Sequence, residues 1–263
     1  MNLRITGTRS ELGGILSRRR VPRAADGVHV NLSGQSANSL LHDGQGWKDF
    51  ARTGLAATRR ALRSARTAGA PSFVHASFAF VHAFERGAVL DEPLRSKVLA
   101  ILECEALALA GSVPACVVRL GYLYGPHSVD LRAYRTAFRI GRPYWCGPPR
   151  ALQYHLHQID AASALLAAAK PANVGKVLYA TDGHPISFRQ LMDAFAHRVD
   201  RRSPLHLPRW TRPLARVIIQ EEHMQQTALA MPPRAPTPRV PGWQPEFADY
   251  RHGLDQVMQA WAD

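Results

Sequence analysis

The segment from Arg119 to Pro126, which reads Arg-Leu-Gly-Tyr-Leu-Tyr-Gly-Pro, limits the possible folds of this chain more than any other. It follows the apolar run 115–118, which is typical of a buried strand. Proline fixes φ and glycine lacks a Cβ, so the backbone must turn sharply where the strand ends. Ligands of open α/β sheets bind at the carboxyl ends of the strands. We therefore expect a parallel sheet with a binding site beside this turn.

Size and composition exclude several classes of protein. With 263 residues, 46% of them hydrophobic and 20% charged, the chain can bury a full-sized core and is not a disordered protein. No apolar run is long enough to cross a bilayer, and residues 1–5 lack the apolar centre of a signal peptide. Three scattered cysteines leave one over from any disulfide, which favours a reducing compartment. The composition predicts a cytoplasmic protein without a membrane segment.

The formal net charge of +13 raises the question of a nucleic-acid partner. The arginines are spread along the chain, apart from the run 18–20 and Arg23. Cations suit the end of a helix, and no helix-turn-helix, zinc or RNA-binding aromatic pattern accompanies this run. We therefore expect no specific nucleic-acid binding. Attraction of a phosphorylated ligand fits an α/β fold better.

The amino terminus resembles a phosphate-binding turn. Residues 3–6 form a short apolar strand, and the glycines of 7–14 lead into a helix, where backbone N–H groups can approach a pyrophosphate. Thr6, Gly7 and Gly13 match the pattern T-G-x-x-G-x-x-G, whereas Ser10 replaces the middle glycine. Its Cβ and hydroxyl point into the space where phosphate would lie.

These motifs together resemble the extended short-chain dehydrogenase/reductase family, which includes nucleotide-sugar epimerases and dehydratases. The segment 119–126 resembles the family signature R-x-x-x-x-Y-G-P, and 242–254 resembles its terminal G-W-x-P…G-L motif. Further matches cover the segments 28–34, 58–69, 72–82, 93–97 and 155–162. The resemblance implies a Rossmann-like α/β fold, with a mostly parallel sheet and helices on both faces.

The chain departs from the family between its first two strands. The few residues of 21–27 cannot hold the two strands and the helix that the family has there, including the acidic residue that binds the adenosine ribose. We therefore expect a reduced sheet. Residues 1–125 would form the reduced dinucleotide-binding core. Residues 126–263 would supply the remaining core elements and a small substrate lobe, in one integrated unit.

The family's proton relay is also changed. Lys97 lies in a segment that resembles Y-x-x-S-K, but the tyrosine position is Pro93 and the hydroxyl position aligns with Phe78. Neither side chain can exchange a proton. The catalytic candidates are therefore Lys97, Ser77, which is adjacent to Phe78, and His82, which we expect in the turn at the carboxyl end of the strand 72–82. An ordinary turn histidine is the simpler interpretation of His82. No residue is assigned to a metal.

The resemblance also implies which residues hold the ligands. We expect NAD or NADP, bound weakly or lost, with its phosphates near Gly7, Arg9 and Gly13 and its ribose near Lys97. Arg9 and the run 18–20 favour NADPH. We expect Arg119, Tyr122 and Tyr124 to contact a small-molecule substrate, phosphorylated or nucleotide-linked. A homodimer is the assembly to test.

Three functions stay open at this point. The first is an NAD(P)-dependent epimerase, dehydratase or reductase that acts on a nucleotide-sugar or similar polar carbonyl or hydroxyl substrate by a non-standard proton relay. The second is a non-catalytic binding or regulatory relative. The third is a cofactor-independent enzyme on the same scaffold, with His82, Ser77 or an acid from Asp91 and Glu92 in proton transfer. A truncated or shifted gene sequence would also produce the missing block.

Overall fold

A five-stranded parallel sheet forms the centre of the protein. The structure is a computed structural model, and it describes residues 3–20, 22–34, 50–141, 147–199, 207, 209–211 and 221–262. The strands follow the order β1-β2-β3-β4-β8, and all neighbouring pairs are parallel. They comprise β1 (Arg4–Thr6), β2 (His29–Asn31), β3 (Phe73–Phe78), β4 (Ala115–Leu120) and β8 (Val177–Ala180).

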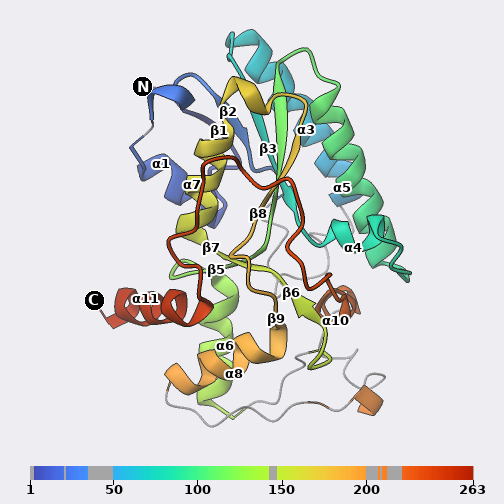
Figure 1. Ribbon diagram of the computed structural model, residues 1–263, viewed down its shortest axis with the longest axis vertical. Helices are drawn as coiled ribbons and strands as arrows, with labels where there is room; N and C mark the ends of the chain where they lie inside the picture. The colour runs from blue at the N-terminus through green and yellow to red at the C-terminus, as the bar shows by residue number, and fades with distance from the viewer. Residues whose placement is uncertain are drawn as a thin grey trace.

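Helices cover both faces of this sheet (Figure 1). Helices α1 (Glu11–Arg18) and α7 (Gln158–Ala168) pack together on one face. Helices α3 (Phe50–Thr67) and α5 (Leu94–Leu109) pack against each other and against β3 and β4 on the other face. The short helix α4 (Val81–Glu85) follows β3. This layering is the one that the family resemblance predicts.

The expected reduction of the sheet is confirmed. β2 pairs directly with β1, with Arg4 opposite His29 and Thr6 opposite Asn31, so only α1 and a short 3-10 helix (Arg23–Ala25) separate the two strands. β1 therefore lies at the edge of the sheet. Asp26 and Gly27 turn the chain into β2 without the additional strands.

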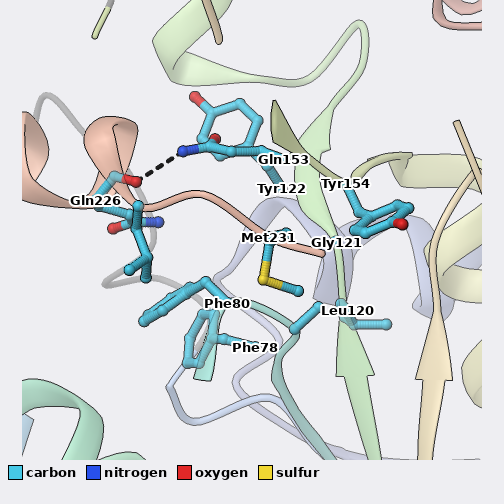
Figure 2. A pocket seen from close by; sticks show the side chains of 11 residues that line it. Phe78, Phe80, Leu120, Gly121, Tyr122, Gln153, Tyr154, Gln226 and Met231 are labelled. Carbon is cyan, nitrogen blue, oxygen red and sulfur yellow. Dashed lines mark hydrogen bonds between the residues drawn. The ribbon is translucent and has the colours of Figure 1, made fainter. Parts of the chain in front are cut away.

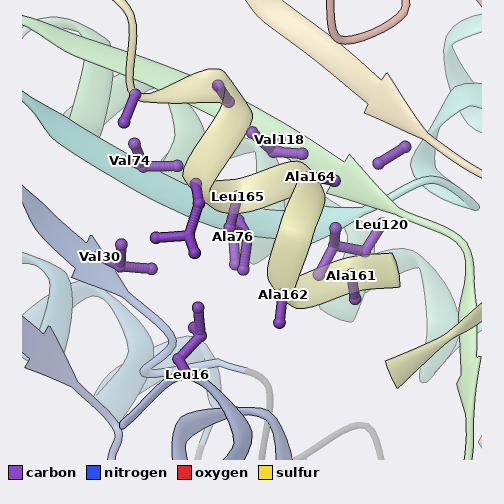
Figure 3. Close-up of a cluster of buried hydrophobic side chains, with 14 of the residues drawn as sticks. Leu16, Val30, Val74, Ala76, Val118, Leu120, Ala161, Ala162, Ala164 and Leu165 are labelled. Carbon is purple, nitrogen blue, oxygen red and sulfur yellow. The ribbon is translucent and has the colours of Figure 1, made fainter. Parts of the chain in front are cut away.

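The main core lies between the sheet and the α1–α7 face (Figure 3). Alternate strand residues such as Val74, Ala76 and Val118 point toward α7, which contributes Ala161 and Leu165. All five are nearly inaccessible to solvent. Helix α7 contributes several alanines to this core, and their small side chains allow the helix to lie close to the sheet.

A second apolar cluster holds a smaller lobe below the sheet in Figure 1. Its helices are α6 (Val129–Arg139), α8 (Phe188–Arg198) and α11 (Tyr250–Ala262). Two small sheets connect the lobe to the core: parallel β5 (Tyr122–Tyr124) with β7 (His155–His157), and antiparallel β6 (Leu152–Gln153) with β9 (Ile186–Ser187). Ser187 begins α8 with a capping box.

The terminal motif is fixed to the core by Asp160 at the start of α7. Its carboxylate accepts hydrogen bonds from the backbone N–H groups of Glu246 and Phe247, at 2.8 and 2.9 Å. Trp243 donates its indole N–H to Ser163 on the same helix at 2.9 Å. These bonds join the segment 242–254 to the segment 155–162 and to the rest of α7. The remaining described elements are the 3-10 helices Pro171–Asn173 and Arg209–Thr211 and helix α10 (Glu221–Ala228).

Candidate functional site

A pocket lies at the carboxyl edge of the sheet, beside the turn that the sequence singles out (Figure 2). The residues that follow β3 and β4 form one wall, and residues from β6, α10 and the segment after α10 form the other. Eleven residues line it: Phe78, Ala79, Phe80, Leu120, Gly121, Tyr122, Gln153, Tyr154, Gln226, Leu229 and Met231. Its free volume of about 30 Å³ has room for water-sized occupants only. A larger ligand therefore requires side chains to move.

The lining of the pocket is mostly apolar. Phe78, Phe80, Leu120 and Met231 point toward one another across it (Figure 2). Met231 is unbranched and adapts readily to new neighbours, so it is the side chain best suited to make room. The lining therefore offers mainly apolar contacts.

Two phenols at the pocket are already hydrogen-bonded elsewhere. Tyr122 donates to the carboxylate of Asp130 at 3.2 Å, and Tyr154 donates to the carbonyl of Pro232 at 2.9 Å. Burial raises the pKa of Tyr122 well above its ordinary value, and burial also raises the pKa of Tyr154. A tyrosine that acts as general acid and base needs the opposite shift. Neither phenol therefore replaces the missing catalytic tyrosine in this arrangement.

Lys97 lies next to the pocket on α5, with 5% of its surface exposed. Its ammonium donates to Oε1 of Gln226 at 3.0 Å and lies 5.4 Å from the centre of the Phe80 ring. Pro93 occupies the N-cap position of the same helix. Gln226 was not singled out from the sequence, because it lies on α10, 129 residues away from Lys97 in the chain.

Ser77 and Arg119 are brought together on the face of the sheet that α5 covers, and neither residue lines the pocket. Ser77 donates its hydroxyl proton to Glu105 on α5, and Arg119 binds the same carboxylate through Nε at 2.9 Å and Nη2 at 2.6 Å. Arg119 also binds Glu85 at 2.5 and 2.7 Å and the hydroxyl of Tyr179 at 2.6 Å. Neighbouring carboxylates raise the pKa of Arg119 against the opposing effect of burial. Arg119 thus holds β4, α4 and α5 together.

His82 lies in α4 and not in a turn, because β3 ends at Phe78. Our expectation that the strand continues to His82 is wrong. Its Nδ1 is 3.1 Å from the hydroxyl of Tyr179 and 3.7 Å from Glu85. Burial lowers the pKa of His82, although Glu85 acts in the opposite direction. The histidine is about one-fifth exposed and joins the Arg119 group.

Tyr124 is fully buried, so its place differs from that of Tyr122. Its hydroxyl contacts α11, where a Cβ on Gly253 would lie 2.2 Å from it. Burial raises the pKa of Tyr124 far above its ordinary value. The second glycine of the turn, Gly125, allows Gln158 to approach, since a Cβ there would lie 2.5 Å from the amide oxygen.

The phosphate-binding turn keeps the shape that the sequence predicts. Gly7 has a φ of +89°, and a Cβ on Gly13 would lie 2.4 Å from the carbonyl oxygen of Gly7, so both positions require glycine. Ser10 caps α1: its hydroxyl donates to the carbonyl of Gly7 at 2.7 Å and accepts from the N–H of Gly13 at 3.1 Å. Arg9 is exposed beside the turn. The first helical residue after this turn carries a charge of its own.

That residue is Glu11, a feature that the sequence did not reveal. Its carboxylate accepts from the backbone N–H of Val129 at 2.6 Å and from the side-chain amide of Gln158. Both partners are more than a hundred residues away in the chain, so no local pattern could indicate them. Burial raises the pKa of Glu11.

Over the ranges described, His, Cys, Asp and Glu side chains nowhere gather in a group of three or more that could hold a metal ion. Cys104 and Cys116 are free and buried, and Cys146 lies outside the described residues. No helix among the described residues is long and apolar enough to span a membrane.

Comparisons with known proteins bear on the fold of the chain. No family model matches the chain. A 3-diazoavenalumate denitrifying reductase from a Streptomyces species is 29% identical over an alignment of 234 residues, and the match covers 83% of this chain and 76% of the relative.

Two solved structures share the whole fold. MoeE5 in complex with UDP-glucose and NAD has a TM-score of 0.72 at 18% identity, and the match covers 100% of this chain and 99% of that one. The human epimerase family protein SDR39U1 (isoform 2) with NADPH has a TM-score of 0.72 at 17% identity, with 98% and 99% covered. The chain therefore has the Rossmann-like fold of the NAD(P)-dependent epimerases, dehydratases and reductases, as its motifs predict.

Proposed function

We propose that this protein is an NAD(P)H-dependent reductase whose substrate accepts a hydride without receiving a proton from the protein. The observation that carries this proposal is the replacement of both proton-exchanging positions, one by Pro93 at the start of α5 and the other by Phe78 in the apolar pocket. Loss of general acid–base assistance typically costs a factor of about 10² to 10⁴ in rate. That cost disappears if the reaction requires no proton transfer.

The cofactor would be held by residues at the carboxyl edge of the sheet. Gly7, Gly13 and the exposed Arg9 would hold its phosphates, and Lys97 its nicotinamide ribose. When bound, the reduced nicotinamide supplies a hydride that can replace a diazonium group, which leaves as N₂ and needs no proton. The NAD and NADPH bound to the structural neighbours support this assignment.

The curated relative supports the substrate class. Its name describes a reductase that removes nitrogen from a diazo compound. The rings of Phe78 and Phe80 and the flexible Met231 offer apolar contacts to a planar aromatic substrate of that kind. Aromatic faces also attract a cationic group, by about 0.5–2 kcal/mol. An aryl diazonium cation is therefore our preferred substrate class.

A nucleotide-sugar substrate is the second candidate, because MoeE5 binds UDP-glucose. It would need the non-standard proton relay through Lys97, Ser77 or His82. Ser77 and His82 are bound to Glu105 and Tyr179 in the group around Arg119, which counts against this relay. Three other statements about this protein stay predictions: that it is a non-catalytic relative, that it is located in the cytoplasm, and that it forms a homodimer.

The decisive experiment follows the origin of the new hydrogen atom. Purified protein is incubated in one reaction with an arenediazonium salt and NADPH deuterated at the transferable position, and in a second, parallel reaction with UDP-glucose and NAD⁺. Deuterium in the arene and release of N₂, at a rate above that of heat-inactivated protein and of the Lys97→Met variant, would support the proposal. Hydrogen drawn from solvent, or turnover of UDP-glucose alone, would contradict it.

A pair of restored side chains serves as the control. If no proton is transferred, Pro93→Tyr and Phe78→Ser should leave the rate with the arenediazonium salt unchanged or lower it by crowding the pocket. A rate that rises by a factor of ten or more in either variant would show that a proton relay limits the reaction.

A further inference from the structure

Three helices begin at one carboxylate. Glu11 is the first residue of α1, Val129 is the first of α6, and Gln158 is the first of α7. Glu11 accepts hydrogen bonds from the other two, while Gln158 in turn accepts from the backbone N–H of His127 at 3.3 Å. Each helix start carries a partial positive charge of about half a unit, so this point strongly favours an anion.

The charged groups around Glu11 have both signs. Arg132 on α6, Arg18 on α1 and His127 in the preceding loop are positive or can become so, and the two arginines lower the pKa of His127 after the effect of burial. Asp130 on α6 is negative and, together with burial, raises the pKa of Glu11. Gln158, from α7, is neutral. The site thus selects an anion, and Glu11 supplies one from within the chain.

This carboxylate is close to the place where a dinucleotide is bound in this fold. The pyrophosphate lies against the first turn of the helix that follows β1. Ser10 already uses the N–H of Gly13, and the adjacent Glu11 places a negative charge on that same turn. A pyrophosphate and an ionised Glu11 would repel each other in a partly buried environment, where the effective dielectric is low.

We propose that Glu11 is an internal competitor of the cofactor pyrophosphate, and that it sets a low affinity for the dinucleotide which rises when its carboxylate is neutral. This inference rests on the proposed NAD(P) binding. It makes Glu11 an affinity-determining residue and not a catalytic one, since its carboxylate contacts helix starts rather than the pocket. Cofactor binding would then require the Glu11 side chain to leave Val129 and Gln158.

The test compares the wild-type protein with Glu11→Gln and Glu11→Ala by calorimetric titration with NADPH, NAD⁺ and inorganic pyrophosphate. Removing the charge should tighten the binding of all three by a factor of ~10 or more. The matched control is Glu103→Gln, which removes an exposed glutamate from α5 and should change no affinity. Thermal unfolding of each variant checks that the junction of the three helices is still folded. If Glu11→Ala is not folded, the comparison uses Glu11→Gln alone.

The pH dependence provides a second readout. NAD⁺ is the probe, because its phosphates do not titrate in this range. Protonation of Glu11 removes the repulsion, so wild-type affinity should rise as the pH falls from 8 to 5.5, and the advantage of Glu11→Gln should shrink. Protonation of His127 acts on both proteins equally and cancels in their ratio.

The outcomes separate this inference from the proposed function. Tighter binding of pyrophosphate by the Glu11 variants, without binding of either dinucleotide by any protein, would support the role of Glu11 and contradict NAD(P) binding. Unchanged or weaker binding of all probes in both variants would overturn the inference, even if the dinucleotides bind. Failure of every protein to bind any probe would overturn both.

Discussion

Replacing Arg119 by methionine should destabilise the protein more than any surface substitution. The guanidinium is 4% exposed and donates to Glu105, Glu85 and Tyr179. Glu105 is also buried, whereas Glu85 is 39% exposed and can be rehydrated. The loss therefore comes mainly from the Glu105 carboxylate, which would stay buried without its cation.

The expected magnitude follows from that uncompensated charge. Removing one partner of a buried ion pair costs about 3–5 kcal/mol, out of a total stability of about 5–15 kcal/mol for a folded protein. For a chain of this size, this corresponds to a decrease in Tm of roughly 6–20 °C. The double variant Arg119→Met with Glu105→Leu should recover most of the loss, because apolar side chains can replace a buried pair at little net cost.

The assay is urea unfolding followed by circular dichroism, which compares midpoints at constant m-value. Arg198 is the matched control, because its Nε binds Asp255 at 2.6 Å, but Asp255 is 52% exposed. Arg198→Met should lose less than about 1 kcal/mol. The reasoning is refuted if Arg119→Met costs no more than Arg198→Met, or if the double variant is less stable than the Arg119 single variant.

Three further predictions concern buried polar groups. Ser10→Ala removes the cap of α1 and should lower the free energy of unfolding by about 1 kcal/mol, whereas Ser10→Gly should lower it by only a few tenths, both measured in urea. Burial raises the pKa of Asp182 to about 8, above its unfolded value, so its contribution to stability is complete below about pH 4 and is lost as the pH rises toward 8. Asp182→Asn should therefore flatten the decline in unfolding free energy between pH 5 and pH 8, and an unchanged slope would argue against it. Gln226→Ala removes a buried acceptor from Lys97 and should cost about 1–3 kcal/mol, whereas Gln226→Glu should recover part of that loss in the same unfolding assay.

The layers of this fold followed from the family resemblance, and two local elements followed from their own residue patterns. The strand before Arg119 and the glycine turn at Gly7 each depend on neighbours within a few residues, and both have the predicted structure. The reduction of the sheet followed from comparing the few residues of 21–27 with the longer segment of the family, whereas the direct pairing of β1 with β2 is a finding of the structure. Loop length and turn chemistry are sufficient for such predictions.

The candidate site was harder to predict because its partners are distant in the chain. Ser77 was expected near the reacting atoms, but alternate strand residues face opposite sides of a sheet, and its hydroxyl faces Glu105 on α5. His82 was expected at the carboxyl end of the strand, because its apolar neighbours continue the strand pattern. In the structure, the chain has already entered α4 at this position. Glu11 and Gln226 gain their roles only from tertiary contacts.

The position of β1 at the edge of the sheet affects how the protein behaves in concentrated solution. An edge strand offers unpaired backbone groups to strands of other molecules, and long apolar edges promote aggregation. Here the edge strand has three residues, and it begins with Arg4, whose side chain is exposed. Both features discourage intermolecular pairing. The short edge, with its exposed arginine, therefore offers little for a strand of a second molecule to pair with.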